Sequence, residues 1–487
     1  MHPRRTAYVE TYGCQMNISD GELMQGILQS SGYEVVERPE DAGVILVNTC
    51  AIREHAEQRV LGRVGELNRL KKDRPELVLG VTGCMAQRMG EDLLGRAPYV
   101  DLVMGPDGYR KLPDALAAVR PGAPVVTATR TVGAGQSAEG VAKGPASGLT
   151  PRVGTGRELP VLRQQPERLA VVEFEPHENY EGLDVSRTGD VGAWVPVQRG
   201  CNYRCTYCIV PYVRGAEKNR APGRVLEEVR EVAASGIPEV TLLGQTVNSY
   251  EYGEWTFARL LREVARVDGI RRVRFTSPHP NDMTSELIAV MAEEAAVCKQ
   301  LHLPVQSGAD RVLKRMVRRY TVDRFLEIVD ELRAAIPDLA LSTDVIVAFP
   351  GETEKEFEAT LALLRTVRFD DAFMYRYSPR DGTPATRLPG EDFLPDVVAQ
   401  ARLERLIRVQ RSIQAEINRS EVGRVEEVLV ERTAKSEGDV LGRTGRNKVV
   451  AFPGDRSLIG AFVHVRLEDT TGATFMGVRV DGEARVA

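Results

Sequence analysis

The chain has 487 residues, seven of them cysteines, and a net charge of −5 from 64 basic and 69 acidic residues. This length allows three or four domains of roughly 100–200 residues, and the charge excludes a global basic field, so any RNA contact must be local. No apolar run approaches the roughly 20 residues of a membrane helix, and the start lacks a signal-peptide core. We therefore expect a cytoplasmic protein that is not bound to a membrane. In that reducing compartment its cysteines should stay thiols unless a metal binds them.

Residues 5–121 alternate β-rich apolar runs with amphipathic stretches such as 54–70. This alternation predicts a parallel sheet with helices on its faces, an α/β domain of flavodoxin-like type. The strands are expected at 7–11, 44–48, 78–82 and 102–104. Residues 122–186 lose the periodicity and are partly rich in Gly, Ala, Ser and Thr, which predicts a linker or insertion with a short ordered part at 169–174. No role can be assigned to it.

The alternation resumes over residues 187–418, where six βα units predict a partial (βα)6 TIM-type barrel. Its strands are expected at 194–198, 239–243, 273–276, 300–303, 340–347 and 372–377. Helices are expected at 225–234, 257–267, 325–335 and 397–416. Residues 420–484 carry short runs separated by Gly, Asp and Asn turns, which predicts a small β-barrel.

Three cysteines, Cys201, Cys205 and Cys208, directly follow the first expected barrel strand. A 4Fe-4S cluster usually takes four cysteines, so three leave one iron open to another ligand. S-adenosylmethionine (SAM) suits that position because its amino and carboxylate groups can chelate the iron. The alternative is a structural zinc site, which needs a fourth Cys or His nearby; residues 209–228 contain neither.

Three further cysteines, Cys14, Cys50 and Cys84, each end an expected strand of the N-terminal domain. Parallel strands bring their C-terminal ends to one edge of the sheet, so these thiols can meet and bind a second iron–sulfur centre with one iron open. A single cysteine in such a place is more often a small buried residue. We expect that simpler role for Cys298, the seventh cysteine, which lies in an apolar run.

Several motifs in order resemble the methylthiotransferase family of radical SAM enzymes, and most closely its MiaB branch. They are TYGCQMN (11–17), VNTCAIRE (47–54), GVTGCMAQR (80–88), RGCNYRCTYCIVPYVRG (199–215), LLGQTVNSY (242–250) and HLPVQSG (302–308). The resemblance implies an N-terminal methylthiotransferase domain, a radical SAM core and a C-terminal TRAM domain. The chain departs from the family pattern at Asn219, Ala309 and Ala348, where Ser, Ser and Gly are expected.

The resemblance also implies two 4Fe-4S clusters and two uses of SAM. The cluster at 201–208 reduces SAM to a 5′-deoxyadenosyl radical, which takes hydrogen from carbon 2 of N(6)-dimethylallyl (isopentenyl) adenosine at position 37 of tRNA. The cluster on the strand-end cysteines supplies the sulfur, after accepting a methyl group from a second SAM. The residues expected to contact SAM are Leu243, Gly244, Gln245, Ser277 and Gln306.

The implied partners are the tRNA anticodon stem-loop, a reductant such as flavodoxin or ferredoxin, and a sulfur source; we expect a monomer. Small β-barrels bind looped RNA through basic loops, and the RNA candidates here are Arg443, Arg446 and Lys448. The basic segment 311–320 is another candidate, although charged helix faces are usually only solvated. The loop at 377–385 is expected to close the barrel mouth, to contact RNA or to be a plain loop.

Three rival functions stay open. Two are methylthiolation of threonylcarbamoyl-adenosine in tRNA and of an aspartate in a ribosomal protein, but the motifs at 11–17 and 47–54 favour the MiaB branch. The third is a metal-stabilised RNA-binding protein without catalysis, which would need a closed coordination sphere rather than three cysteines at each site.

Overall fold

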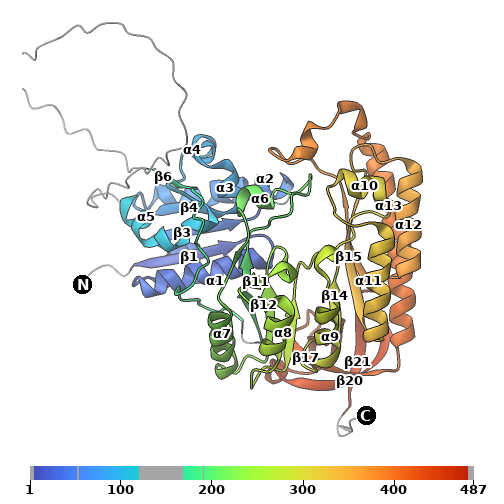
Figure 1. The fold of residues 1–487 in the computed structure, drawn as a ribbon. Helices are drawn as coiled ribbons and strands as arrows, with labels where there is room; N and C mark the ends of the chain where they lie inside the picture. The colour runs from blue at the N-terminus through green and yellow to red at the C-terminus, as the bar shows by residue number, and fades with distance from the viewer. Residues whose placement is uncertain (1–4, 52–53, 120–167, 190, 481–487) are drawn as a thin grey trace, which may run out of the picture.

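The structure is a computed structural model that describes residues 5–51, 54–119, 168–189 and 191–480. It contains an N-terminal α/β domain, a central partial barrel and a small terminal β-barrel (Figure 1). Within the described ranges, no helix combines the length and apolar character needed to cross a bilayer.

The N-terminal sheet has six parallel strands in the order β2-β1-β3-β4-β5-β6. The four expected strands are present within a residue of their predicted ends, which confirms the parallel α/β fold. The last strand, β6, falls in the short ordered part that the sequence suggested at 169–174 within the expected linker or insertion. The expected linker up to residue 167 lies outside the described residues. The strands are β1 (Thr6–Thr11), β2 (Glu34–Val35), β3 (Val44–Thr49), β4 (Val78–Gly83), β5 (Leu102–Met104) and β6 (Leu169–Val171).

Helices cover both faces of this sheet, and for this reason every residue of β3 and β4 is buried. Apolar residues of α1 and α5 pack on one face, and those of α2, α3 and α4 pack on the other. The helices are α1 (Gln15–Ser30), α2 (Glu54–Leu67), α3 (Cys84–Met89), α4 (Glu91–Arg96) and α5 (Leu112–Ala118).

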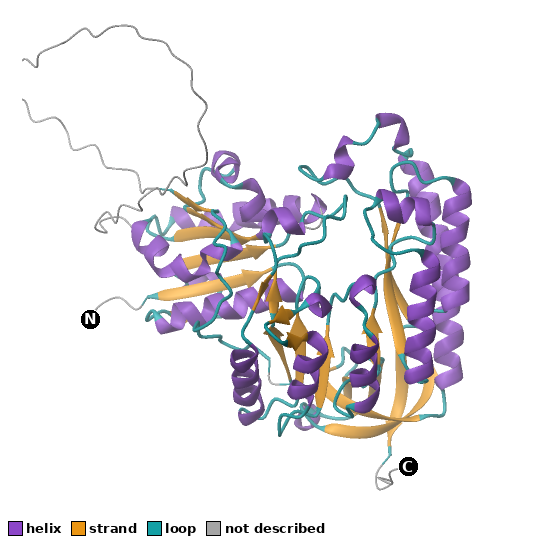
Figure 2. Cartoon of the chain, viewed as in Figure 1, coloured by secondary structure: helices purple, strands orange, loops and turns teal. Residues whose placement is uncertain are grey.

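The central domain has the six expected parallel strands, in two three-stranded sheets, β13-β10-β7 and β14-β15-β16. A bridge from Val273 to Val297 links them, and helices lie outside the strands (Figure 2). This confirms the partial barrel. The strands are β7 (Gly192–Pro196), β10 (Glu239–Leu243), β13 (Arg272–Phe275), β14 (Gln300–His302), β15 (Ala340–Val347) and β16 (Asp371–Arg376). The helices are α7 (Pro222–Ala234), α8 (Phe257–Ala265), α9 (Ser285–Glu293), α10 (Asp310–Arg315), α11 (Val322–Ala335), α12 (Glu354–Val367) and α13 (Asp396–Glu421).

The terminal domain is a closed five-stranded barrel in the order β17-β18-β19-β21-β20. It lies at the base of the central domain in Figure 1, where Arg272, at the start of β13, donates to the carbonyl of Arg443 at 2.8 Å. It therefore docks near the N-terminal ends of the central strands, whereas the cysteine loop follows a C-terminal end. The strands are β17 (Val425–Thr433), β18 (Asp439–Thr444), β19 (Val449–Pro453), β20 (Phe462–Thr470) and β21 (Thr474–Arg479).

Two candidate iron–sulfur sites

The first site lies at the C-terminal edge of the N-terminal sheet. Cys14 precedes α1, Cys50 follows β3 and Cys84 begins α3, so the three cysteines end the neighbouring strands β1, β3 and β4. Gly13 has φ +134°, and a Cβ there would lie 2.5 Å from the Cβ of Cys50. Only glycine allows this approach, so the backbone before the first cysteine is built to bring two of the thiols together.

The thiols of this site interact directly. A hydrogen bond from Cys50 and the charge of Arg214 lower the pKa of Cys14 to about 6, although burial opposes them. Burial raises the pKa of the Cys84 thiol, which also interacts with Cys14. The structure thus brings together the three cysteines that sequence reasoning grouped from their positions after strands.

The second site is formed by the loop at 200–217, whose ends are paired by β8 (Gln198–Arg199) and β9 (Lys218–Asn219). Cys201 Sγ lies 3.1 Å from Thr246 Oγ1, and Cys208 donates its backbone N–H to the carbonyl of Cys205 at 3.0 Å. Burial and the neighbouring Cys205 raise the pKa of Cys208 to about 12. The loop therefore holds three buried or half-buried thiols beside the C-terminal end of β10.

Among the residues that the structure describes, no three His, Cys, Asp or Glu side chains converge closely enough to hold one metal ion. The cysteines of a 4Fe-4S cluster bind different iron atoms and so need not converge on one point. Thiols bind iron as thiolates, so cluster assembly at either site would release protons.

The residues expected to contact SAM follow three neighbouring strands beside the cysteine loop. Leu243 ends β10 and is followed by Gly244 and Gln245, Ser277 lies after β13, and Gln306 lies after β14. Ser277 and Gln306 have φ of +60° and +70°, a strained backbone that is typical of functional sites.

Several polar atoms at this mouth are buried without a hydrogen-bond partner among the described residues: Gln245 Oε1, Gln306 Oε1 and His279 Nε2. Such atoms are costly unless a ligand satisfies them. His279 also stacks on Tyr203 of the cysteine loop, with ring centroids 3.9 Å apart, and burial lowers its pKa to about 2, so the imidazole is neutral. The mouth of the barrel can therefore hold a polar ligand next to the cysteines.

Sequence reasoning missed two arginines that reach the thiols. Arg214 Nε donates to Cys84 Sγ at 3.2 Å, and Arg318 Nη1 donates to Cys205 Sγ at 3.6 Å. Arg318 lies in the basic segment that was considered for RNA, but it is only 9% exposed. No local pattern marks either residue, because both contacts join distant parts of the sequence.

The loop at 377–385 packs behind the cysteine loop. Ala385 is fully buried and donates its backbone N–H to the carbonyl of Thr206 at 2.9 Å. Its apolar neighbours include Phe349 and Tyr207. This loop therefore supports the loop that carries the cysteines.

Arg446 and Lys448, two of the residues expected to contact RNA, both pair with carboxylates. Arg446 pairs with Glu421 at 2.7 Å and with Glu426 at 3.1 Å. Lys448 is 9% exposed and pairs with Asp370 at 2.7 Å. Both side chains thus attach the terminal barrel to neighbouring elements, and their role as RNA contacts stays a prediction.

The third expected RNA contact, Arg443, keeps a partly exposed side chain, which pairs with Glu431 at 3.2 Å. In the basic segment at 311–320, Arg315 pairs with Asp392, whereas Arg319 is exposed. Arg311, Lys314 and Arg319 of this segment are exposed, whereas Arg443 of the terminal barrel is half-buried.

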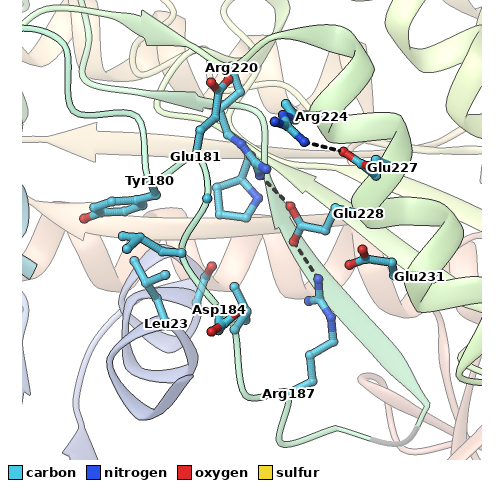
Figure 3. A pocket seen from close by; sticks show the side chains of 15 residues that line it. Leu23, Tyr180, Glu181, Asp184, Arg187, Arg220, Arg224, Glu227, Glu228 and Glu231 are labelled. Carbon is cyan, nitrogen blue, oxygen red and sulfur yellow. Dashed lines mark hydrogen bonds and ion pairs between the residues drawn. The ribbon is translucent and has the colours of Figure 1, made fainter. Parts of the chain in front are cut away.

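A pocket of about 410 Å³ lies between α1, the segment at 180–187 and α7 (Figure 3). At its wall, Glu228 accepts ion pairs from Arg187 at 2.5 Å and from Arg220 at 2.6 Å. None of the six grouped cysteines lines it. The ion pairs attach α7 to the segment before β7, so this pocket belongs to the boundary between the domains.

Three parts of the chain match described families: residues 195–364 match the Radical SAM superfamily, residues 6–105 match the Uncharacterized protein family UPF0004, and residues 419–477 match the TRAM domain. The structure of the radical S-adenosylmethionine methyltransferase TsrM from Kitasatospora setae, with cobalamin and a 4Fe-4S cluster bound, has a TM-score of 0.52 and 15% identity. That alignment covers 89% of this chain and 78% of TsrM, and shows likeness of fold alone. The barrel, its cysteine loop and the superfamily match define a radical SAM enzyme, a class that uses SAM and a 4Fe-4S cluster.

Curated relatives give the narrower assignment. The tRNA-2-methylthio-N(6)-dimethylallyladenosine synthase of Moorella thermoacetica is 42% identical, over 98% of this chain and 99% of the relative. The enzyme of the same name from Porphyromonas gingivalis is 40% identical, over 98% and 95%. The chain belongs to the family of tRNA-2-methylthio-N(6)-dimethylallyladenosine synthases.

Proposed function

We propose that this enzyme attaches a methylthio group to carbon 2 of N(6)-dimethylallyl-adenosine at position 37 of tRNA, with one 4Fe-4S cluster at each cysteine site. The observation that carries the proposal is the proximity of the two sites. Ile209 and Val213 of the SAM-site loop pack in one buried cluster with Ala51 and Cys84 of the N-terminal domain. A sulfur donor and a radical source that act on one carbon atom need this proximity.

Cys201, Cys205 and Cys208 would hold the cluster of the SAM site, and Cys14, Cys50 and Cys84 the auxiliary cluster. With SAM bound, the first supplies a 5′-deoxyadenosyl radical and the second supplies sulfur and, from another SAM, the methyl group. Radical chemistry suits carbon 2 of adenine, which has no acidic proton for a base to remove.

The side chains around the SAM site have separate tasks in this proposal. Gln245 and Gln306 carry buried oxygen atoms without partners and would accept hydrogen bonds from the SAM amino group. Thr246 and Arg318 contact the thiols of Cys201 and Cys205 and would orient the cluster ligands. The neutral His279, stacked on Tyr203, closes the wall of the site and excludes water.

For partners, we propose the anticodon stem-loop of tRNA, a flavodoxin- or ferredoxin-type reductant, a sulfur source, a monomeric enzyme and a cytoplasmic location. The target base lies in a loop, so the enzyme must turn it out of its stack to reach the SAM site. Arg319, over the ring of Tyr203 with the guanidinium carbon 6.0 Å from the ring centroid, and Arg443 are the cations that we assign to RNA phosphates.

The test is anaerobic reconstitution followed by an iron count and mass spectrometry of nucleosides. We expect about eight iron atoms per chain, four for each cluster, and a methylthio product on tRNA that carries dimethylallyl-adenosine. The same assay on tRNA that carries threonylcarbamoyl-adenosine, and on ribosomal protein, tests the rival substrates. Product on either of those alone would overturn the proposed substrate, and SAM-independent RNA binding without product would overturn the reaction.

A further inference from the structure

Arg214 connects the two cysteine sites. It follows α6 (Val210–Val213) in the loop of the SAM site, and Figure 1 shows α6 beside α3 of the N-terminal domain, which it contacts. Its side chain is only 3% exposed. The Nε atom donates to Cys84 Sγ at 3.2 Å, and the Nη2 atom pairs with Asp20 Oδ2 at 2.7 Å. One side chain from the SAM-site loop thus reaches a thiol of the other site.

A further donor of this guanidinium lacks an acceptor. Arg214 Nη1 is buried and has no hydrogen-bond partner among the residues that the structure describes. A buried N–H without an acceptor is costly, so the geometry indicates an acceptor that binds beside Cys84. Thiolate and sulfide sulfur atoms are acceptors with negative charge, and the planar guanidinium can donate to more than one of them.

The backbone fixes Arg214 relative to the cysteines of its own loop. Cys201 donates its backbone N–H to the carbonyl of Gly215 at 3.1 Å. Arg214 itself donates its backbone N–H to the carbonyl of Val210 at 2.8 Å. The backbone of the SAM-site loop therefore sets the position from which the guanidinium reaches Cys84.

We infer that Arg214 is a positioning residue that holds the auxiliary cluster against the SAM-site loop and, by donating to the sulfur of Cys84, raises the reduction potential of that cluster. The inference rests on the proposed function, because it requires a cluster on Cys14, Cys50 and Cys84. Local charge and hydrogen bonds to sulfur set the potential of an iron–sulfur cluster. A cation stabilises the reduced state, which carries more negative charge, so its removal lowers the potential.

The experiment uses the full chain with all three SAM-site cysteines replaced by Ala, so that only the auxiliary cluster titrates. In this parent, Arg214→Gln removes the cation. We expect the ratio of reduced to oxidised cluster at a fixed potential to fall about tenfold, which corresponds to a reduction potential lower by about 59 mV for one electron. Arg214→Lys keeps the charge and should lower the ratio less. Asp20→Asn removes the opposing charge and should raise the ratio.

The matched control is Lys218→Gln. Lys218 lies in the same segment and pairs with Asp107 at 2.5 Å across the same domain boundary, with its side chain 8% exposed, but its hydrogen bonds go to Asp107 and to the carbonyl of Glu175, not to a cysteine. We expect this variant to keep the potential of the parent. Equal shifts in Lys218→Gln and Arg214→Gln would attribute the effect to a loosened boundary and would overturn the inference.

The remaining outcomes separate the inference from the proposed function. A parent that binds no iron refutes both. A parent that binds the cluster, with an unchanged potential in Arg214→Gln and Asp20→Asn, refutes the inference alone. If thermal denaturation shows that Arg214→Gln does not fold, the opposite shifts expected for Arg214→Lys and Asp20→Asn decide the question.

Discussion

Arg318 donates to the sulfur of Cys205 at 3.6 Å, and the same guanidinium donates to the carbonyl of Pro304 at 2.9 Å. Replacing Arg318 with Gln should slow SAM cleavage about 10-fold to 100-fold, the usual cost of losing a group that orients a cluster ligand. The measurement is the rate of 5′-deoxyadenosine formation with chemical reductant. Arg319→Gln is the control, because Arg319 is the next residue in the chain and its side chain is exposed. Equal losses of SAM cleavage in both variants would contradict a specific role of Arg318.

Replacing Cys205 with Ala should abolish 5′-deoxyadenosine formation, because the SAM-site cluster loses one of its three ligands. The proposed auxiliary cluster would be bound in another domain, so about four iron atoms per chain should remain. Iron analysis and product chromatography measure both quantities. Cleavage of SAM by a folded variant at the rate of the parent would show that the cluster is held elsewhere.

Replacing Cys50 with Ala should separate the two halves of the reaction. SAM cleavage should continue, since no SAM-site ligand changes, but the methylthio nucleoside should be absent from the tRNA product. Cys298→Ala is a matched control, because this cysteine is also buried and lies in neither group of three. Normal product from the Cys50 variant would exclude the auxiliary site as the sulfur donor.

Replacing Lys448 with Met should destabilise the enzyme by about 2 kcal/mol, because it leaves the half-buried carboxylate of Asp370 without its cation. The salt dependence of tRNA binding should not change. Arg443→Ala breaks a more exposed ion pair and should lower the free energy of unfolding by less than about 1 kcal/mol. The slope of the logarithm of the tRNA binding constant against the logarithm of the salt concentration should fall in magnitude by about one unit. Denaturation midpoints and binding at several salt concentrations measure these effects, and a lower slope in the Lys448 variant would support its role in RNA binding.

Replacing Ala348 with Gly should stabilise the enzyme by about 1 kcal/mol. Ala348 has φ +56° and is 5% exposed, and this left-handed conformation is unfavourable for a residue with a Cβ. Ala372→Gly, in the regular strand β16, should instead destabilise by roughly 0.5–1 kcal/mol. Denaturation midpoints that shift in the same direction for both variants would contradict this account.

The strained conformation of Ala348 also explains one departure from the family pattern. The resemblance suggested glycine at this position, and a positive φ is the physical reason for that preference. The other two departures, Asn219 and Ala309, have no such strain: neither has a positive φ.

Most strands could be predicted because a buried parallel strand leaves a continuous apolar run in the sequence. The sequence indicated a short ordered part at 169–174 within the linker but not a strand of the sheet, because β6 has only three half-buried residues. Its place at the edge of the sheet depends on pairing with β5, which is a contact between distant segments.

The sequence by itself determined the two groups of cysteines, because the spacing of Cys201, Cys205 and Cys208 is local and a strand end is visible in the pattern of apolar residues. Only the tertiary structure decided which cations are free. In the sequence Lys448 resembles a surface lysine, but in the structure it pairs with Asp370. Arg214 resembles an ordinary loop cation in the sequence, but in the structure it donates to the sulfur of Cys84. The physical reason is that burial and ion pairing depend on partners far away in the sequence, which no local pattern records.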